Sequence, residues 1–449
     1  SCSGTTVTPC PAGFYCPESG GTLPCATGDY SVAGSSSCGG SFTTIAVTGF
    51  TGTGNALKYK YYGQVAVGNK IYFAPLFQDN VGVFDTTTNA FTTITTGLTG
   101  AYKYGGAVLV GTKIYFTPTH QNNVGVIDTT NDSFTTIDIS GVVSGIHKYD
   151  GAGVVVGTKI YFAPINQDNV GVFDTADNVF TTIDISGVVD QDFKYRDAVM
   201  VGTKIFFVPN QGAGDLGVGV LNTVDNAFTT IATTGVTGNY KYAGVGVVGT
   251  KIYFSPHNQD NVGVLDTTNN AFTTIATTGV TGDGKYTEAV VVGTKIFFAP
   301  FTEDNVGVLD TTNNAFTTIA TTGVTGTWKY GGAVLLNGKI YCTPGTQNNV
   351  GVVTIPYTST TCPTGTYASG TAACLSCPAG KSNDGTGLTD VKQCLSPPES
   401  VELRVAGDNA LSIAIEPPDD NGGANITHFT VEVYHSDVES IVEFPLAPT

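Results

Sequence analysis

Five charged residues depart from a pattern that otherwise repeats along the chain, and their side chains could bind a small polar ligand. They are Asp150, Arg196, Asp197, Asp215 and Glu288. A few charged groups placed around a concave surface can hold and orient such a ligand. If the chain binds a small ligand, we expect these side chains to contact it. Ordinary variation among repeat copies is the alternative interpretation.

Residues that would support catalysis are scarce. A sialidase-like site needs several arginines to hold a carboxylate, and Arg196 is the only arginine between residues 41 and 356. A metal oxidase or hydrolase needs clustered histidines, whereas His120, His147 and His257 fall in different repeat copies. No Ser-His-Asp or Gly-x-Ser-x-Gly arrangement is visible. We therefore expect a protein that is not an enzyme and that holds no cofactor.

A recurring Gln-Asp-Asn triplet could also carry chemistry. It occurs at residues 78–80, 167–169 and 259–261, with Glu-Asp-Asn at 303–305. Calcium takes several oxygen ligands, so calcium and sugar binding stay as alternatives. Asp and Asn side chains that precede a strand more often hydrogen-bond to their own turn. We predict turn stabilisation and no bound metal.

The composition argues against two kinds of partner. The chain has 449 residues, a formal net charge of −17 and only two arginines. Nucleic-acid binding needs clustered cations that neutralise phosphates, so we expect no nucleic-acid partner. The sequence has no run of 18 apolar residues, so we also expect no membrane span.

Seven copies of one motif supply the elements that would position the candidate residues. Each copy contains a Lys-Tyr pair, and successive pairs are 43 to 47 residues apart. In the second copy, strand signals cover residues 107–110, 113–116, 124–128 and 134–137, with short connections between them. Four strands in a repeat of this length are typical of a β-propeller blade. The pairs begin at Lys60, Lys103, Lys148, Lys194, Lys241, Lys285 and Lys329.

The two ends of the repeat array predict how the ring closes. The seventh copy stops after its third strand signal, at residues 350–355, and the missing fourth signal, residues 41–45, precedes the first copy. We therefore predict an all-β fold in which a seven-bladed propeller covers residues 41–356. The N-terminal strand completes the last blade, which leaves no open end to the array. The candidate residues then lie at the mouth of the central channel, on the face with the long loops.

The lysines follow the repeat as well. Fourteen of the 19 Lys and Arg residues occupy two fixed repeat positions, which indicates a role in the scaffold. Lys70 opens a second strand and Asp85 ends the next one, so we predict a cross-strand ion pair worth at most ~1 kcal/mol. In the fourth and seventh copies, Asn222 and Thr354 replace the aspartate.

The repeat resembles the kelch family of propellers over about 315 residues. The shared features are an apolar first strand, a hairpin leading to Lys-Ile-Tyr, a Val-x-Val-x-Asp strand and an Asx turn before the outer strand. The double glycine of kelch repeats is here Ala74-Pro75, and the outer-strand tryptophan is here Phe91. The resemblance implies the fold but no particular partner.

Two cysteine-rich segments flank the predicted propeller, at residues 1–40 and 357–396. They share a Cys-Pro-x-Gly-x-Tyr frame that resembles the ephrin-receptor-like cysteine-rich repeat. Segments this short need disulfides in place of a core, although the spacing of Cys374 and Cys377 leaves zinc as an alternative. We expect the disulfides Cys25–Cys38, Cys362–Cys374 and Cys377–Cys394, and the pairing of Cys2, Cys10, Cys16 and Cys342 stays open. Cys342 is either a small buried core residue or bridged to an N-terminal cysteine.

Residues 397–449 resemble the start of a fibronectin type III domain. The resemblance rests on the Pro-Pro-Glu-Ser-Val start at residue 397, the alternation over 411–415 and the segment 426–433. A complete sandwich of this kind needs ~90 to 100 residues. We therefore expect a partial β-sandwich, so that either the chain is a fragment or a partner supplies the missing strands.

Together these features favour an extracellular protein. Asn131 and Asn425 begin N-glycosylation sequons, and the expected disulfides indicate a secreted or cell-surface location. We expect a structural or adhesive module of a large secreted assembly such as a fibre, surface hair, wall or matrix. Its partners would be other copies, head to tail, or other extracellular proteins. The alternative is a receptor-like propeller that binds carbohydrate or protein through its long-loop face.

Overall fold

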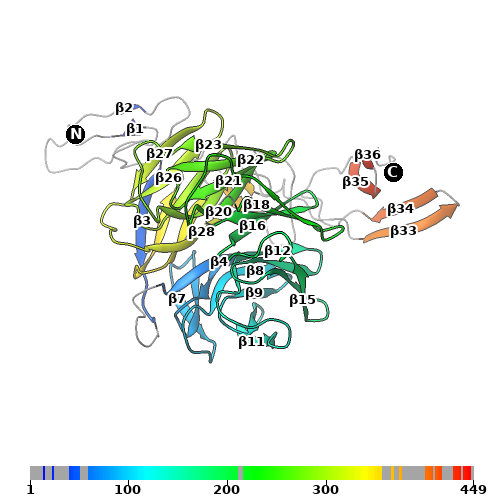
Figure 1. The fold of residues 1–449 in the computed structure, drawn as a ribbon, viewed down its shortest axis with the longest axis horizontal. Helices are drawn as coiled ribbons and strands as arrows, with labels where there is room; N and C mark the ends of the chain where they lie inside the picture. Colours follow the sequence, from blue (N-terminus) through cyan, green and yellow to red (C-terminus); the bar gives the residue numbers. More distant parts are fainter. Residues whose placement is uncertain are drawn as a thin grey trace. The chain divides into compact units, whose positions relative to one another are not determined.

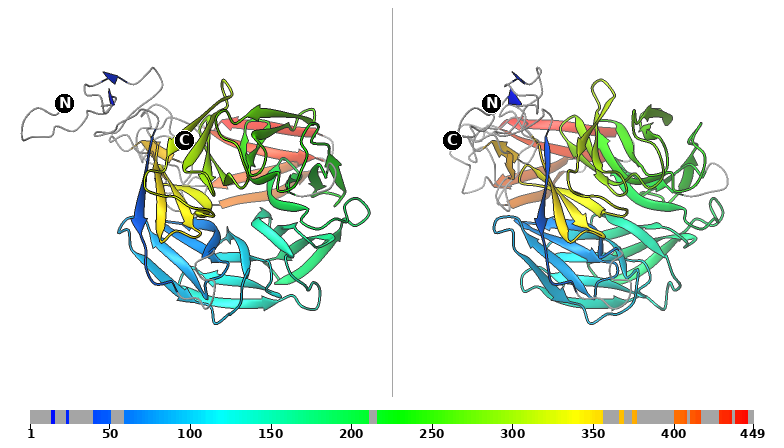
Figure 2. Two further views of the ribbon diagram at one scale, coloured as in Figure 1. Left: turned by 60° about the vertical axis from the view of Figure 1, so that its left-hand side comes forward. Right: turned by 90° about the vertical axis from the view of Figure 1, so that its left-hand side faces the viewer.

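The computed structural model describes residues 40–50, 59–210 and 216–355 in full, and elsewhere only the backbone of eight short strands. The chain divides into two compact units, Ser1–Ile355 and Pro356–Thr449. The fully described part is all-β. It consists of seven four-stranded antiparallel sheets arranged in a ring (Figures 1 and 2). The predicted seven-bladed propeller is therefore confirmed.

The blades follow one another along the chain. Blade 1 contains β4 (Tyr61–Val67), β5 (Lys70–Pro75), β6 (Asn80–Asp85) and β7 (Phe91–Thr95). Blade 2 contains β8 (Tyr104–Val110), β9 (Lys113–Pro118), β10 (Asn123–Asp128) and β11 (Ser133–Asp138). Blade 3 contains β12 (Tyr149–Val156), β13 (Lys159–Pro164), β14 (Asn169–Asp174) and β15 (Val179–Asp184). Blade 4 contains β16 (Tyr195–Val201), β17 (Lys204–Pro209), β18 (Val218–Asn222) and β19 (Phe228–Ile231).

The remaining blades repeat this order. Blade 5 contains β20 (Tyr242–Val248), β21 (Lys251–Pro256), β22 (Asn261–Asp266) and β23 (Ala271–Ala276). Blade 6 contains β24 (Tyr286–Val292), β25 (Lys295–Pro300), β26 (Asn305–Asp310) and β27 (Ala315–Ala320). Blade 7 contains β28 (Tyr330–Leu336), β29 (Lys339–Pro344), β30 (Asn349–Thr354) and the N-terminal β3 (Ser41–Ala46). The first strand of each blade lies at the axis and contacts the first strands of both neighbours.

Ring closure occurs as the sequence predicts. Strand β3 pairs antiparallel with β30, in a register that runs from Ser41 opposite Thr354 to Ala46 opposite Asn349. Residues from the two ends of the array thus share one sheet, so that separating blade 7 from blade 1 also requires breaking a strand pair.

The other described strands fall in the flanking segments. They are β1 (Phe14–Tyr15), β2 (Leu23–Pro24), β31 (Thr366–Ala368), β32 (Cys374–Ser376), β33 (Ser400–Gly407), β34 (Ala410–Glu416), β35 (His428–His435) and β36 (Val438–Pro445). They pair as four two-stranded sheets in chain order. The predicted disulfides, the zinc alternative and the fibronectin-like sandwich concern side chains outside the described residues, so they stay predictions.

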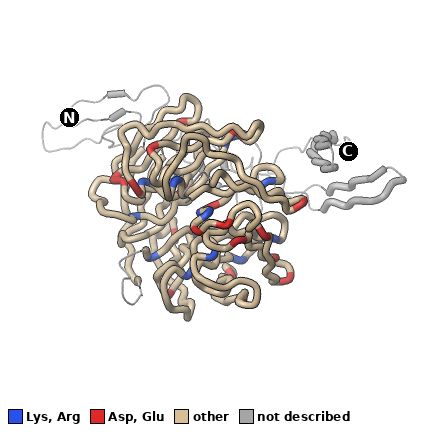
Figure 3. Tube along the Cα trace, viewed as in Figure 1, with Lys and Arg blue, Asp and Glu red and all other residues tan. Residues whose placement is uncertain are grey.

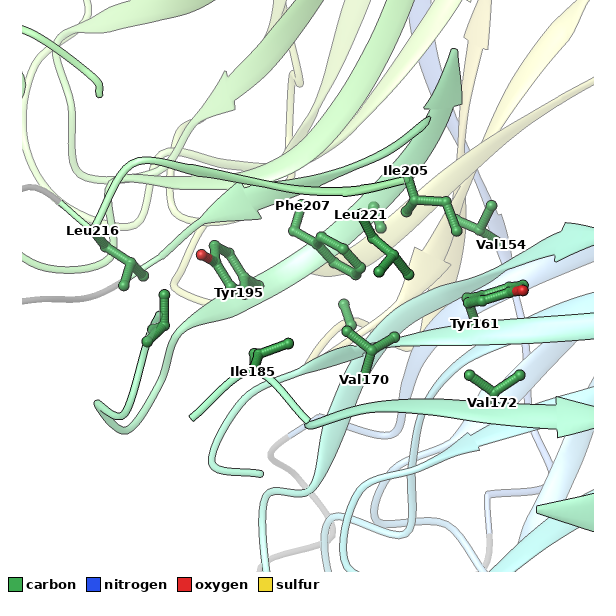
Figure 4. Packing of buried hydrophobic residues seen from close by; sticks show 13 residues of the cluster. Val154, Tyr161, Val170, Val172, Ile185, Tyr195, Ile205, Phe207, Leu216 and Leu221 are labelled. Carbon is green, nitrogen blue, oxygen red and sulfur yellow. The ribbon is translucent and has the colours of Figure 1, made fainter. Parts of the chain in front are cut away.

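Neighbouring blades pack through apolar side chains of their facing sheets. Between blades 3 and 4, Tyr161, Val170 and Val172 meet Ile205, Phe207 and Leu221 (Figure 4). The third strand carries a glycine between its two core valines in every blade. In blade 6, a Cβ on Gly307 would come within 2.8 Å of the Phe316 ring and 2.9 Å of the Tyr286 ring. The Val-Gly-Val pattern therefore makes room for the two large rings that cover each sheet.

A closed circuit of backbone hydrogen bonds joins all seven blades. In each copy the lysine of the Lys-Tyr pair donates its backbone N–H to a carbonyl of the preceding blade. That carbonyl belongs to the residue that follows the proline at the end of the preceding blade's second strand. The N–H of that residue in turn donates to the lysine carbonyl of its own blade. The bonds are 2.8 to 3.2 Å long. The circuit runs Lys60, Gly345, Lys329, Phe301, Lys285, His257, Lys241, Asn210, Lys194, Ile165, Lys148, Thr119, Lys103, Leu76 and back to Lys60.

The lysine side chains strengthen the same junctions. Lys285, whose side chain is fully buried, places Nζ 2.9 Å from Asp260 Oδ1 of the preceding blade. Equivalent ion pairs join Lys103 to Asp79, Lys194 to Asp168 and Lys329 to Asp304 at 2.7 to 3.0 Å. The aspartates of the Gln-Asp-Asn triplets thus bind the next blade's lysine, a role that the predicted stabilisation of their own turn did not include. At the junction of blades 2 and 3, Lys148 Nζ donates to Asn122 Oδ1, so an amide replaces the carboxylate. Burial lowers the pKa of Lys148 to about 8.

Lys70 and Asp85 lie opposite each other as predicted, but the Asp85 carboxylate has a different partner from the predicted lysine. The two residues face each other across β5 and β6. Asp85 Oδ1 accepts hydrogen bonds from the backbone N–H and hydroxyl of Thr87, at 2.8 and 2.6 Å, and these bonds lower the pKa of Asp85. Lys70 lies 3.5 Å from Asp132 of the neighbouring blade. The carboxylate therefore caps the turn that leads to the outer strand.

The tyrosine of each Lys-Tyr pair holds its own blade together. The Tyr286 hydroxyl donates to Asn305 Oδ1 at 2.5 Å, and the same bond recurs in five other blades at 2.5 to 2.7 Å. In blade 4, Gly217 stands where the other blades have asparagine. The buried Tyr195 hydroxyl there has no hydrogen-bond partner among the described residues.

This difference between blades predicts a difference in stability. We expect Tyr286→Phe to lower the free energy of unfolding by about 1–2 kcal/mol, because it removes a buried hydrogen bond and leaves Asn305 Oδ1 unpaired. Tyr195→Phe is the matched control, and we expect its change to stay within about 0.5 kcal/mol. Urea denaturation of both variants measures this. Equal destabilisation by the two substitutions would contradict the assignment.

Candidate functional site

A β-bulge in the first strand of every blade turns two residues toward the axis. In blade 1 the register slips between Tyr61 and Gln64, and five other first strands slip at the same place. In blade 3 the slip lies one residue later, between Asp150 and Val154. Bulges re-aim side chains in this way. The first of the two bulge residues is Tyr62, Gly105, Asp150, Arg196, Ala243, Thr287 or Gly331. The second is Gly63, Gly106, Gly151, Asp197, Gly244, Glu288 or Gly332, and we call these seven residues the glycine layer.

Most residues of these two sets line a small cavity at the axis. Its volume is about 30 Å³, and its lining includes Tyr62, Arg196, Asp197, Thr287 and Glu288. Glycine is required in the layer because the strands converge. A Cβ on Gly151 would come within 2.5 Å of Asp197 Oδ1 and 2.7 Å of the Arg196 carbonyl. Arg196, Asp197 and Glu288 therefore line one cavity, and Asp150 lies 3.8 Å from Arg196. Asp215 lies outside the described residues.

Arg196 crosses the axis from blade 4. Its Nε donates to the Tyr62 hydroxyl of blade 1 at 3.0 Å, and its guanidinium carbon lies 5.6 Å from the centre of the Tyr62 ring. A terminal nitrogen lies 3.3 Å from His257 Nε2 of blade 5, and Nε lies 3.8 Å from the Asp150 carboxylate of blade 3. One side chain thus connects four blades and bridges the channel.

Burial controls the charges around this bridge. It raises the pKa of Asp150 to about 6, while the positive charge of Arg196 opposes the rise. It lowers the pKa of His257 to about 3, and Arg196 adds to that effect. His257 Nδ1 lies 2.9 Å from the Tyr286 carbonyl, so this nitrogen carries the ring proton and Nε2 accepts from Arg196. The imidazole is therefore a neutral support for the guanidinium.

Asp197 and Glu288 are the only non-glycine members of the glycine layer, in blades 4 and 6. Burial raises the pKa of Glu288 to about 7 and raises that of Asp197 well above its usual range, with the negative charge of Glu288 adding to the second shift. Asp197 Oδ1 has no hydrogen-bond partner within the described part of the chain. The layer thus holds two carboxyl groups that influence each other electrostatically, and one unsatisfied oxygen.

A set of aromatic residues that sequence reasoning missed surrounds the same end of the channel. The residue before each Lys-Tyr pair is aromatic in six blades and Gly284 in the remaining one. We call the six side chains the aromatic collar; they are Tyr59, Tyr102, His147, Phe193, Tyr240 and Trp328. All six have φ between 50° and 60°, which is unfavourable for bulky residues. The recurrence of an aromatic type at one repeat position was the available signal.

Ring contacts connect the collar around the mouth. Tyr59 stacks on Trp328 with centroids 4.8 Å apart, and Phe77 joins Tyr59 to Tyr102 at 6.5 and 4.7 Å. His147 lies 5.2 Å from Tyr102 and 5.7 Å from Phe193. The rings stay partly accessible, and Tyr102 and Tyr240 are 36% and 38% exposed. The face therefore presents a broad aromatic surface directly next to the polar bridge.

The remaining predicted residues have other places. Asn131 lies exposed in the β10–β11 turn, where its Oδ1 accepts the Ser133 N–H at 2.9 Å, and Asn425 lies outside the described residues. Cys342 is a free, buried thiol whose pKa burial raises to about 12. This agrees with the interpretation of Cys342 as a core residue and not with a bridge to the N-terminal segment.

Charged residues elsewhere on the propeller are of mixed sign. Lys and Arg are interspersed with Asp and Glu over the blades (Figure 3). Residues 40–50, 59–210 and 216–355 contain no group of three or more His, Cys, Asp or Glu that could hold a metal. The same part of the chain contains no helix long and apolar enough to cross a membrane.

Comparison with known proteins supports the fold. No family model and no curated protein matches the sequence. Among solved structures, a virginiamycin B lyase from Staphylococcus aureus has a TM-score of 0.57 at 14% identity, over 70% of this chain and 99% of that one. The WD40 repeats of RRP9 give 0.52 at 9% identity, over 70% and 97%. Hydrazine synthase from Kuenenia stuttgartiensis gives 0.53 at 12%, over 66% and 95%. These similarities show a propeller, and their diversity leaves the activity open.

The environment of His257 predicts its protonation. We expect the imidazole to stay neutral at pH 5, with the proton on Nδ1, because burial and Arg196 both oppose a second proton. Two-dimensional ¹H–¹⁵N NMR of the histidine rings, assigned with His257→Gln, measures this directly. An imidazolium pattern for His257 at pH 5 would contradict the arrangement.

Proposed function

We propose that the protein is a non-catalytic recognition module that binds carbohydrate through the aromatic collar, as part of a secreted adhesive or structural assembly. The observation that carries the proposal is the collar itself. Six aromatic residues are kept in an unfavourable backbone conformation at one end of one channel. Strained, partly exposed residues concentrate at functional sites.

The chemistry of the collar suits sugars. A pyranose ring has an apolar C–H face that packs on an aromatic face, and hydroxyl groups at its edge that need polar partners. Tyr102 and Tyr240 offer both an apolar ring and a hydroxyl, and both are exposed. A rigid aromatic surface also loses little side-chain entropy on binding.

The polar groups at the axis favour support over catalysis. Arg196, Tyr62 and His257 use their hydrogen-bonding groups on one another and on the Tyr286 carbonyl. A catalytic acid, base or nucleophile needs access to a reacting group. We therefore assign to this bridge the task of holding the collar-bearing blades in position.

The extracellular setting is the second part of the proposal. It rests on the sequence: the cysteine-rich frames and the fibronectin-like segment that flank the propeller are typical of modular extracellular proteins. In this setting a partial sandwich would take a strand from a neighbouring copy and give head-to-tail association. Asn131 would carry a glycan on an exposed turn.

A glycan array followed by calorimetry tests the binding function. We expect a defined set of glycans to bind the full chain, and Tyr102→Ala and Tyr240→Ala each to weaken that binding at least tenfold. The control is Val224→Ala, which changes a residue that is 76% exposed in the β18–β19 turn, at the other end of the blade. This variant should bind as the wild type does.

Two results would sink the proposal. One is an array with no binding, accompanied by filaments in material from the native source, which would favour a purely structural role. The other is glycan binding that neither collar substitution changes.

A further inference from the structure

We propose that the cavity at the glycine layer binds one calcium ion between Asp197 and Glu288. The two carboxyl groups come from blades 4 and 6, with Gly244 of blade 5 between them in the ring. Both line the cavity of about 30 Å³ at the axis. The inference is independent of carbohydrate binding, because it concerns the polar layer and not the collar.

The charges around the cavity leave a deficit that matches a divalent cation. The charged residues of the bulges are Asp150, Arg196, Asp197 and Glu288, and His257 is neutral. Arg196 lies 3.8 Å from Asp150, so these two charges offset each other. When both are ionised, Asp197 and Glu288 contribute two negative charges at the axis, where unpaired charge is costly. An ion of charge +2 balances them.

An unsatisfied oxygen marks the position independently of charge. Asp197 is 8% exposed, and its Oδ1 has no hydrogen-bond partner among the described residues. A buried acceptor without a partner destabilises a fold unless something outside the chain satisfies it. Ser255 Oγ is a second buried oxygen in that condition. In blade 2, Thr117 at the same strand position donates to the backbone carbonyl of Gly151 in the next blade's layer. The residue that corresponds to Gly151 in the blade after Ser255 is Glu288.

The donor set selects the type of ion. The lining offers carboxylate, hydroxyl and carbonyl oxygens, whereas both nitrogens of His257 are engaged. Oxygen ligands in an irregular arrangement suit calcium. The close approach of the strands brings the Thr287 carbonyl beside Gly244 and the Arg196 carbonyl beside Gly151, and both residues line the cavity. Magnesium demands near-ideal octahedral geometry, which an irregular set of protein oxygens serves less well.

Calorimetric titration of the full chain with CaCl₂, after dialysis against a chelator, tests the inference. We expect a calcium site that Glu288→Gln or Asp197→Asn weakens at least tenfold. Asp283→Asn is the matched control, since it removes an exposed carboxylate two residues before the Lys285-Tyr286 pair, and it should bind calcium as the wild type does. Calcium should also raise the melting temperature of the wild type and the control.

Other outcomes overturn the proposal. One is the absence of calcium binding at millimolar concentration. Another is equal binding in all four proteins, which would place the ion elsewhere. A third is equal affinity for MgCl₂ and CaCl₂. Melting of the metal-free proteins at pH 8 adds a check that does not need the ion. Replacing either carboxyl group by an amide removes the repulsion between the two, so both neutral variants should melt at or above the wild type. A lower melting temperature would mean that the carboxyl groups stabilise the fold without calcium.

Discussion

The closed circuit of backbone hydrogen bonds at the Lys-Tyr pairs is the constraint on which the rest of the structure depends. Each blade alone is a small twisted sheet with two apolar faces, and it is stable only between two neighbours. At each of the seven blade junctions, the circuit fixes the distance and angle between adjacent blades at the same level of the channel. Because buried N–H and C=O groups must be paired, a blade that moved at this level would lose several bonds at once.

The features of the candidate site follow from that constraint. Holding the first strands close together leaves no room for Cβ atoms at the second bulge residue, so the layer is glycine except where Asp197 and Glu288 are accommodated. The residue before each lysine must adopt a positive φ for the chain to enter the circuit. Aromatic residues at that position are stabilised by the ring contacts they make with one another, and these contacts offset the strain of their backbone.

The sequence predicts the fold because its signals are local and are repeated seven times. Hairpin residues, prolines at strand ends and the displaced strand at residues 41–45 each have a direct structural meaning. The site was predictable in part, since departures from the repeat identified Asp150, Arg196, Asp197 and Glu288. The Arg196–Tyr62 and Lys285–Asp260 contacts were not, because they join different blades and depend on the ring geometry. The aromatic collar was not predicted, because aromatic residues in a repeat usually indicate positions in the hydrophobic core.

Native-state hydrogen exchange tests the central claim most directly, with mass spectrometry or NMR resolving the amides of the circuit. If the circuit is one closed unit, the amides of all seven lysines, including Lys60 at the junction of blades 7 and 1, should exchange only through global unfolding and show one common free energy. If Lys60 and Gly345 exchange far faster than Lys148 and Lys194, the ring opens locally at its closure, which would contradict a single closed circuit.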